Sequence, residues 1–300
     1  MHEIYNMYRL SNTRELIGRH NENTNDNRHN NVLYGDINYD IDSNTWQLIA
    51  QNKPQTDKSM AAMRSIPQMN RGAQGMFLEH LQGTRTEIDN IANVMHNAKQ
   101  KYTMFTGNDA TEDSFKSLSG KGVTLLHIAT HGFFEKTQQE DNNKYDNEYN
   151  GKQKKEDNAM RRTGMFFTGA NSWLAGEKTP DNVDDGVLTA QEVSYLDFTD
   201  CDLVVLSACE TALGDVTGEG VFGLQRGFKK AGANSLLMSL WPVDDKATQI
   251  LMSEFYRNLM ERKLSKRVAL QEAQNFLRKT DNGKYDNPHY WATFVLTDAW

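Results

Sequence analysis

Two short apolar runs that stop at reactive residues constrain this sequence more than any other feature. Residues 203–206 form a leucine- and valine-rich run that leads to Cys209, and residues 123–130 form a similar run that leads to His131 and Gly132. Short continuous apolar runs are typical of parallel strands that are covered on both faces. Ligand and reaction sites in such sheets gather beyond the carboxyl ends of the strands. The sequence therefore predicts that one strand brings a thiol, and another an imidazole, to the same edge of a parallel sheet.

Strand and helix patterns alternate along most of the chain, which favours an α/β fold with a mainly parallel sheet and right-handed crossovers. The expected strands cover residues 32–37, 102–105, 123–130, 203–206, 235–240 and 292–296. The expected helices cover residues 84–100, 112–118, 189–196 and 221–231, with two more after residues 245 and 265.

Helix starts are indicated by local capping signals. Thr84 with Glu87, and Thr189 with Glu192, have the spacing of a capping box, in which a hydroxyl and a carboxylate satisfy main-chain N–H groups at a helix start. Asp245 is predicted to be the N-cap of the helix that follows it.

The polar segments divide the chain. Residues 1–30 are rich in asparagine and are predicted to be an extension or linker, and residues 31–300 are predicted to be one domain. Residues 42–76 are expected to be irregular. Residues 135–185 are expected to be a surface insertion, within which residues 164–170 are a candidate strand. The basic pairs of this insertion are either solvated or a processing site.

Charge and cysteine content narrow the function classes. The formal net charge of −7 disfavours nucleic-acid binding. Cys201 and Cys209 form neither a disulfide framework nor a zinc motif, which fits a reducing cytoplasm. The sequence has no secretory signal pattern and no apolar stretch of membrane-spanning length, so we expect neither secretion nor membrane insertion.

The predicted chemistry is nucleophilic catalysis by a thiolate. An imidazole at His131 would remove the proton of the Cys209 thiol and stabilise the resulting charge. The N–H groups of Gly132 and Cys209 are candidates for an oxyanion hole. We expect no cofactor and no metal. The alternative is that Cys209 is only a small apolar residue.

Competing motifs are incomplete. His127 and His131 lack the glutamate of a zinc peptidase helix, and the glycines of residues 214–223 lack the Gly-Lys-Ser/Thr of a phosphate loop. Ser207 lacks the flanking glycines of a serine nucleophile elbow. We expect His127 to be buried and hydrogen-bonded, and Cys201 to be structural.

The motifs taken together resemble the CHAT domain, a branch of the caspase and separase superfamily. The resemblance is carried, in order, by residues 127–132, 206–211, 218–224, 239–245 and 290–294. It implies a caspase-like αβα sandwich. It also implies that His131 and Cys209 form the peptidase dyad.

The resemblance to caspases and metacaspases implies that Ser207 lines the pocket for the substrate residue before the cleaved bond. Glu210 is expected to face the same pocket. Asp244 and Asp245 either receive a basic substrate residue or cap a helix, and Trp241 either walls the substrate groove or belongs to the core.

The resulting hypothesis is a cytoplasmic cysteine endopeptidase that cleaves a protein substrate through a thioester. The resemblance implies regulated proteolysis or bacterial defence, in which a gasdermin-like pore former or another effector is cut. CHAT domains usually follow tetratricopeptide repeats and this sequence contains none, so a regulatory sensor of that kind is expected to be missing, replaced or located on another chain. The alternatives are a catalytically silent caspase-like binding module and an amidase that acts on a small molecule.

Overall fold

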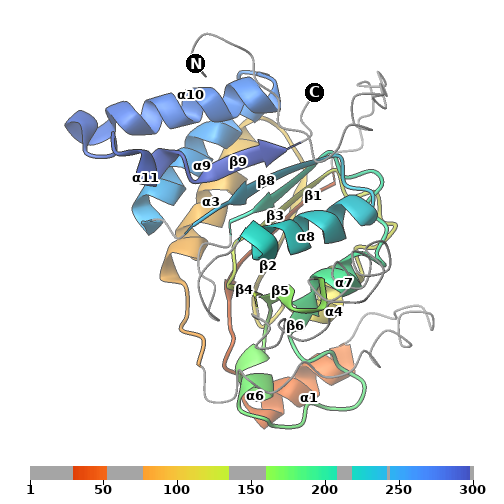
Figure 1. The fold of residues 1–300 in the computed structure, drawn as a ribbon. Helices are drawn as coiled ribbons and strands as arrows, with labels where there is room; N and C mark the ends of the chain where they lie inside the picture. Colours follow the sequence, from red (N-terminus) through yellow and green to blue (C-terminus); the bar gives the residue numbers. More distant parts are fainter. Residues whose placement is uncertain (1–29, 53–76, 135–159, 208–217, 242–243, 298–300) are drawn as a thin grey trace, which may run out of the picture.

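The computed structural model describes residues 30–52, 77–134, 160–207, 218–241 and 244–297, with only the main chain described for residues 218–222. A six-stranded sheet runs through the centre of the molecule in the order β2-β1-β3-β7-β8-β9 (Figure 1). Its strands are β1 (Asn31–Ile37), β2 (Tyr102–Gly107), β3 (Leu125–Ile128), β7 (Leu203–Leu206), β8 (Ser235–Ser239) and β9 (Phe294–Thr297). All neighbouring pairs are parallel except β8 with β9. The two apolar runs therefore form adjacent central strands, as the sequence predicts.

Helices cover both faces of this sheet, which gives the caspase-like αβα sandwich (Figure 1). One face carries α3 (Gln82–Asn97), α9 (Asp245–Met260) and α10 (Lys266–Lys279). The other face carries α4 (Glu112–Lys116), α7 (Ala190–Val193), α8 (Gly218–Lys230) and a small antiparallel sheet. The small sheet consists of β4 (Gly132–Phe134), β5 (Thr163–Phe166) and β6 (Val187–Thr189). The remaining short elements are α1 (Ser43–Asn52), α6 (Ala170–Leu174), η3 (Thr280–Gly283) and α11 (Pro288–Trp291).

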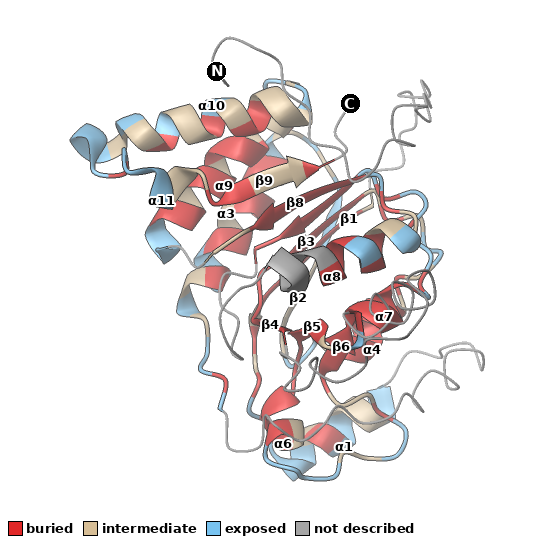
Figure 2. Ribbon diagram, viewed as in Figure 1, coloured by how far each residue is buried: buried red, intermediate tan, exposed pale blue. Residues whose placement is uncertain are grey.

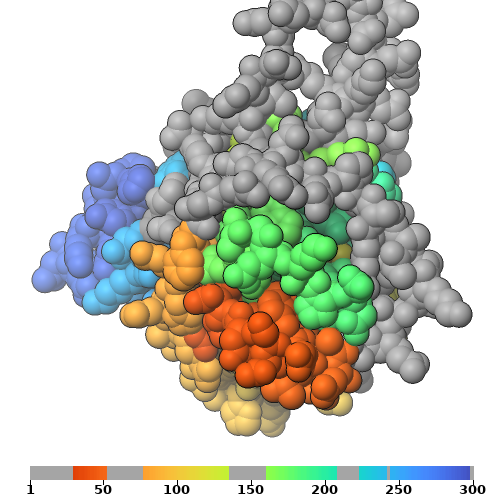
Figure 3. Space-filling model, turned by 90° about the horizontal axis from the view of Figure 1, so that it is seen from below, coloured from red at the N-terminus to blue at the C-terminus, as the bar shows by residue number. Residues whose placement is uncertain are grey.

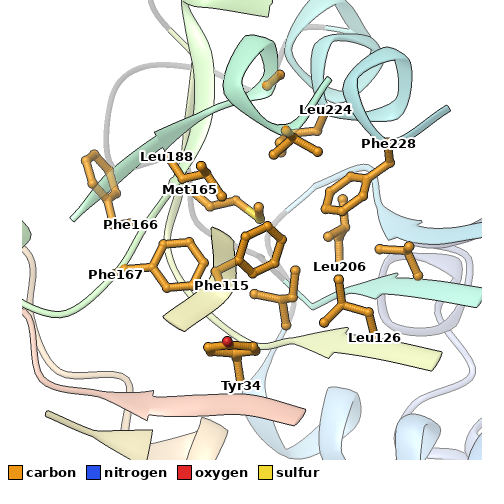
Figure 4. Packing of buried hydrophobic residues seen from close by; sticks show 14 of the residues in the cluster. Tyr34, Phe115, Leu126, Met165, Phe166, Phe167, Leu188, Leu206, Leu224 and Phe228 are labelled. Atoms are coloured by element: carbon orange, nitrogen blue, oxygen red, sulfur yellow. The ribbon is translucent and has the colours of Figure 1, made fainter. Parts of the chain in front are cut away.

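The main core consists of two apolar layers, one on each face of the central sheet (Figure 2). The inner strands β1, β3, β7 and β8 are buried along nearly their whole length, whereas the edge strands β2 and β9 are partly exposed. Alternation along β3 sends Leu126 and Ile128 into one layer and Leu125 into the other. Aromatic rings fill the layer beneath α8, where Tyr34 and Phe115 meet at 5.8 Å between ring centroids (Figure 4). These rings hold the central and the small sheet together.

The two predicted capping boxes have different outcomes. Thr189 and Glu192 form a complete box, in which Thr189 Oγ1 accepts from the Glu192 N–H at 3.2 Å and Glu192 Oε2 accepts from the Thr189 N–H at 2.9 Å. The prediction for Thr84 and Glu87 is wrong, because α3 begins at Gln82 and both residues lie inside it. Glu87 instead points into the core, with its Oε1 3.2 Å from His127 Nε2.

Two segments that were predicted to be irregular or exposed contribute to the fold. Within residues 42–76, α1 is a helix anchored by the buried Trp46, whereas residues 53–76 lie outside the described residues. Within residues 135–185, β5 and α6 are almost fully buried, so this part is core and not a surface insertion. The apolar sequence of residues 164–170 explains the burial. Residues 135–159 lie outside the described residues.

A buried ion-pair cluster joins α4 to the segment that leads into α7. Lys116 Nζ lies 2.6 Å from Glu112 Oε1, 3.0 Å from Glu192 Oε1 and 3.5 Å from Asp184 Oδ2. Glu112 Oε2 also accepts hydrogen bonds from the N–H groups of Gly186 and Val187. The cluster therefore fixes α4 against the start of β6.

Asp185, beside this cluster, should make stability depend on pH. Burial raises the pKa of Asp185 from its ordinary 3.8 to about 6. Because the pKa is raised in the folded state, the contribution of Asp185 to the free energy of unfolding is fully present below pH 3.8. It is lost as the pH rises through 6. Asp185→Asn keeps an oxygen for the Val187 N–H and removes the cost of a buried charge. We expect this variant to gain about 2 to 3 kcal/mol in free energy of unfolding at pH 7.5.

Urea unfolding of wild type and Asp185→Asn at pH 4 and pH 7.5 measures this difference. The gain should disappear at pH 4, and the exposed control Asp181→Asn should change little at either pH. An equal gain at both pH values would contradict the assignment to the charge of Asp185.

Candidate active site

The carboxyl edge of the central sheet brings the predicted catalytic segments together. Strands β3 and β7 are neighbours in register, with Ile128 opposite Leu206, and the Ser207 N–H donates to the Ile128 carbonyl at 2.9 Å. His131 and Cys209 follow the ends of these two strands by the same number of residues. Cys209 itself, like Glu210, lies outside the described residues.

The imidazole of His131 is held in one orientation. The residue is only 4 % exposed, and its Nε2 lies 2.8 Å from the main-chain carbonyl oxygen of Glu79. A carbonyl oxygen only accepts hydrogen bonds, so Nε2 carries the hydrogen. In the neutral ring, Nδ1 is then the nitrogen that can take up a proton. Sequence reasoning missed Glu79, because a main-chain oxygen has no signature in the residue type.

Tyr39 supports the main chain of His131. Its hydroxyl oxygen accepts from the His131 N–H at 3.3 Å and lies 2.9 Å from Thr130 Oγ1. The Thr130 hydroxyl donates to the Phe166 carbonyl at 2.5 Å, so the Tyr39 hydroxyl is free to donate to Thr130. Burial raises the pKa of Tyr39 to about 12, which keeps this hydroxyl protonated. Sequence reasoning also missed this residue, which follows β1 in an otherwise polar segment.

The N–H of Gly132 points away from the small sheet. The Phe166 N–H donates to the His131 carbonyl at 3.0 Å, so His131 and Phe166 are a hydrogen-bonded pair of the antiparallel ladder. Hydrogen-bonded and non-hydrogen-bonded pairs alternate in such a ladder, and Gly132 opposite Met165 is the next pair. The Gly132 N–H is therefore directed outward from the edge strand β4, on the side away from β5.

Ser207, the residue directly after β7, has a buried hydroxyl. The residue is 5 % exposed, and its Oγ has no hydrogen-bond partner within the described part of the chain. Alternation along β7 places it on the same face as Val205, toward α3 and α9. A buried hydroxyl without a partner is costly, so this position is suited to a polar group of a bound molecule.

Trp241 and the two aspartates lie after the end of β8. Trp241 is half-buried, and its Nε1–H donates to the His289 carbonyl at 2.9 Å, so it packs on α11 at the rim of the domain rather than in the core. The N-cap of α9 is Asp244, whose Oδ1 accepts from the Ala247 N–H at 3.0 Å. The prediction that Asp245 is the cap is wrong by one residue, because the helix begins at Asp245 and the non-helical residue before it supplies the capping oxygen.

The other cysteine and histidine of the motifs are structural. Cys201 is fully buried, and burial raises the pKa of its thiol to about 12, which leaves it unreactive. His127 is also fully buried, with Nδ1 3.1 Å from the Tyr256 hydroxyl and Nε2 3.2 Å from Glu87. The expectation of a buried, hydrogen-bonded His127 is confirmed.

The described residues contain no group of three or more histidine, cysteine, aspartate or glutamate side chains that could hold a metal ion. No helix in this part of the chain is long and apolar enough to cross a membrane.

The fold defines a caspase-like α/β protein, and sequence comparison identifies its family. The model of the CHAT domain matches residues 3–298, so the chain belongs to the CHAT domain family, which is related to caspase-like peptidases. Among curated proteins, the chain is 36% identical over 110 residues to Tetratricopeptide repeat protein 28 of Homo sapiens. The protein of the same name from Mus musculus shows the same identity over the same length. These alignments include 37% of this chain and 4% of each relative, so the chain spans only a small part of the relatives that it matches.

Proposed function

We propose that this protein is a cysteine endopeptidase in which His131 activates the thiol of Cys209. The observation that carries the proposal is the orientation of His131, whose Nε2–H is directed to the Glu79 carbonyl at 2.8 Å. That orientation leaves Nδ1 as the proton acceptor, on a residue that follows β3, the neighbour of the strand that leads to Cys209. Membership of the CHAT domain family supports the same assignment.

The reaction would proceed through a thioester. His131 Nδ1 takes the proton of the Cys209 thiol, and the thiolate attacks the carbonyl carbon of the substrate peptide. The imidazolium then gives its proton to the departing amine as the C–N bond breaks, and His131 next takes a proton from the water that hydrolyses the thioester. The N–H groups of Gly132 and Cys209 would stabilise the negative oxygen of each tetrahedral intermediate.

Substrate recognition would involve the segments that follow β7 and β8. Ser207 would line the pocket for the residue before the cleaved bond, with Glu210 nearby in sequence. Trp241 would wall the groove. Asp244 and Asp245, which are both exposed, would receive a basic substrate residue, and Asp244 also caps α9.

A role in regulated proteolysis follows from the same proposal. The substrate would be a protein, and an effector such as a gasdermin-like pore former is one class that fits. The similarity to proteins named for tetratricopeptide repeats supports a repeat protein of that kind as a regulatory partner. A bacterial defence role in the cytoplasm is the setting that we propose.

Cleavage of a diverse peptide library by the purified chain, read by mass spectrometry, tests the activity. We expect cleavage by wild type and by Cys201→Ala, and none by Cys209→Ala. Cleavage that persists in Cys209→Ala would contradict the proposal. If no form cleaves any peptide, an autonomously active endopeptidase is excluded and a silent binding module is favoured.

A further inference from the structure

An extended segment before α3, residues 77–81, crosses the carboxyl edge of the sheet and contacts His131. We call it the strap. Its Glu79 carbonyl accepts the hydrogen bond from His131 Nε2, and its Leu78 side chain is buried, at 3 % exposure. Figure 3 shows the orange residues of this part of the chain on the surface beside the green residues around α6. The strap therefore sets the position of the acceptor that orients the imidazole.

One side chain clamps the strap through its main chain. Asn171, in α6, accepts from the Leu78 N–H with Oδ1 at 2.9 Å and donates to the Leu78 carbonyl with Nδ2 at 3.1 Å. The asparagine is 5 % exposed, so both hydrogen bonds are shielded from water. Because one planar amide satisfies both polar groups of the residue next to Glu79, it fixes the direction of the strap as well as its distance.

The same residue is tied to the other support of His131. The Asn171 N–H donates to the Tyr39 carbonyl at 3.0 Å, and the Tyr39 hydroxyl accepts from the His131 N–H. Asn171 is thus connected to the histidine main chain through Tyr39 and to the imidazole through the strap. The strap makes a second contact that is open to solvent, in which His80 Nε2 lies 2.9 Å from Asp36 Oδ1.

We propose that Asn171 is a positioning residue, which holds the strap so that the Glu79 carbonyl keeps the His131 imidazole oriented with Nδ1 as the base. The inference rests on the proposed cysteine endopeptidase function. The side chain of Asn171 acts through the main chain of Leu78, and it has no role in proton transfer.

The test combines kinetics with a spectroscopic signal from the imidazole itself. In Asn171→Ala we expect kcat for Cys209-dependent cleavage to fall about tenfold to hundredfold, with KM within about twofold. In protein labelled with ¹⁵N-histidine, wild type should show a slowly exchanging Nε2–H signal that is absent from His131→Gln. That signal should be lost in Asn171→Ala, because the strap no longer holds its acceptor.

Asn171→Asp and Ser172→Ala are the matched variants. Asn171→Asp keeps the acceptor for the Leu78 N–H but turns an oxygen toward the Leu78 carbonyl, so it should resemble Asn171→Ala. Ser172→Ala removes a buried hydrogen bond from the next residue of the same helix, the one from Trp46 Nε1, without touching the strap. It should keep both the Nε2–H signal and the kcat of wild type.

Retention of the Nε2–H signal in Asn171→Ala would overturn the inference, whatever happens to kcat, and so would its absence from wild type. The signal does not depend on turnover. If wild type cleaves nothing, the proposed peptidase fails, while loss of the signal in Asn171→Ala alone still supports the positioning of the imidazole.

Discussion

Replacing His131 with glutamine should lower kcat/KM for Cys209-dependent cleavage by about 10³-fold, within the 10² to 10⁴ that general acid–base groups contribute. Glutamine can still donate an N–H to the Glu79 carbonyl, but it cannot accept a proton at catalytic pH. The fold should therefore survive while the base is lost. The pKa of the Cys209 thiol should also rise, because the proposed ion pair with the imidazole can no longer form.

The rate of alkylation by iodoacetamide, measured from pH 5 to pH 10, reports how much of the Cys209 thiol is deprotonated at each pH. The thiol of wild type should react at a lower pH than the thiol of His131→Gln, which should react only as the pH becomes alkaline. His96→Gln, an exposed histidine in the last turn of α3, is the matched control and should behave as wild type. Equal pH profiles for wild type and His131→Gln would show that the two residues do not form a dyad.

Replacing Lys116 with methionine should lower the free energy of unfolding by about 3 to 5 kcal/mol at pH 7.5, the range for breaking a buried ion pair. Methionine fills a similar volume but leaves Glu112, Glu192 and Asp184 without their cation. In wild type, burial lowers the pKa of Lys116, yet these carboxylates more than offset it and hold the pKa above its ordinary value. The lysine therefore stays charged at every pH at which the protein works.

The loss in Lys116→Met should grow with pH. Burial raises the pKa of Glu112 well above its ordinary value, and Lys116 opposes this rise. Without Lys116, the carboxyl group of Glu112 in the folded state is protonated still more readily. Its stabilising contribution is then present below about pH 4.5, the ordinary pKa of a glutamate, and is lost as the pH rises. Urea unfolding at pH 4.5 and 7.5 measures this, with the exposed Lys121→Met as control. If Lys116→Met loses the same free energy of unfolding at both pH values, the cause is a packing defect instead.

The sequence predicts the central sheet well, because burial of a parallel strand requires an apolar run whatever its neighbours are. The runs that became β3 and β7 are examples, and their end points located His131 correctly at the carboxyl edge. The capping boxes show the limit of local patterns. Thr189 and Glu192 form a box, whereas the same spacing at Thr84 lies inside a helix, because α3 begins at Gln82 and Glu87 points into the core beside His127.

The supports of the site could not be predicted in this way. Glu79 contributes a main-chain oxygen, and Asn171 contributes an amide that binds main chain 93 residues away in sequence. Such contacts depend on tertiary structure and leave no periodicity or spacing in the sequence. The helix α1 was also missed, because it buries only Trp46 and its pattern is too polar to indicate a helix.

The use of a main-chain oxygen to orient His131 has a consequence for how this site evolves. Every residue type provides a main-chain carbonyl at position 79, unless it distorts the strap. Mutations there can therefore accumulate without changing the orientation of the His131 imidazole. Position 171 has no such freedom, since few side chains present a donor and an acceptor side by side. When related chains are sorted into active and inactive members, the residue at position 171 should thus be more informative than the residue at position 79.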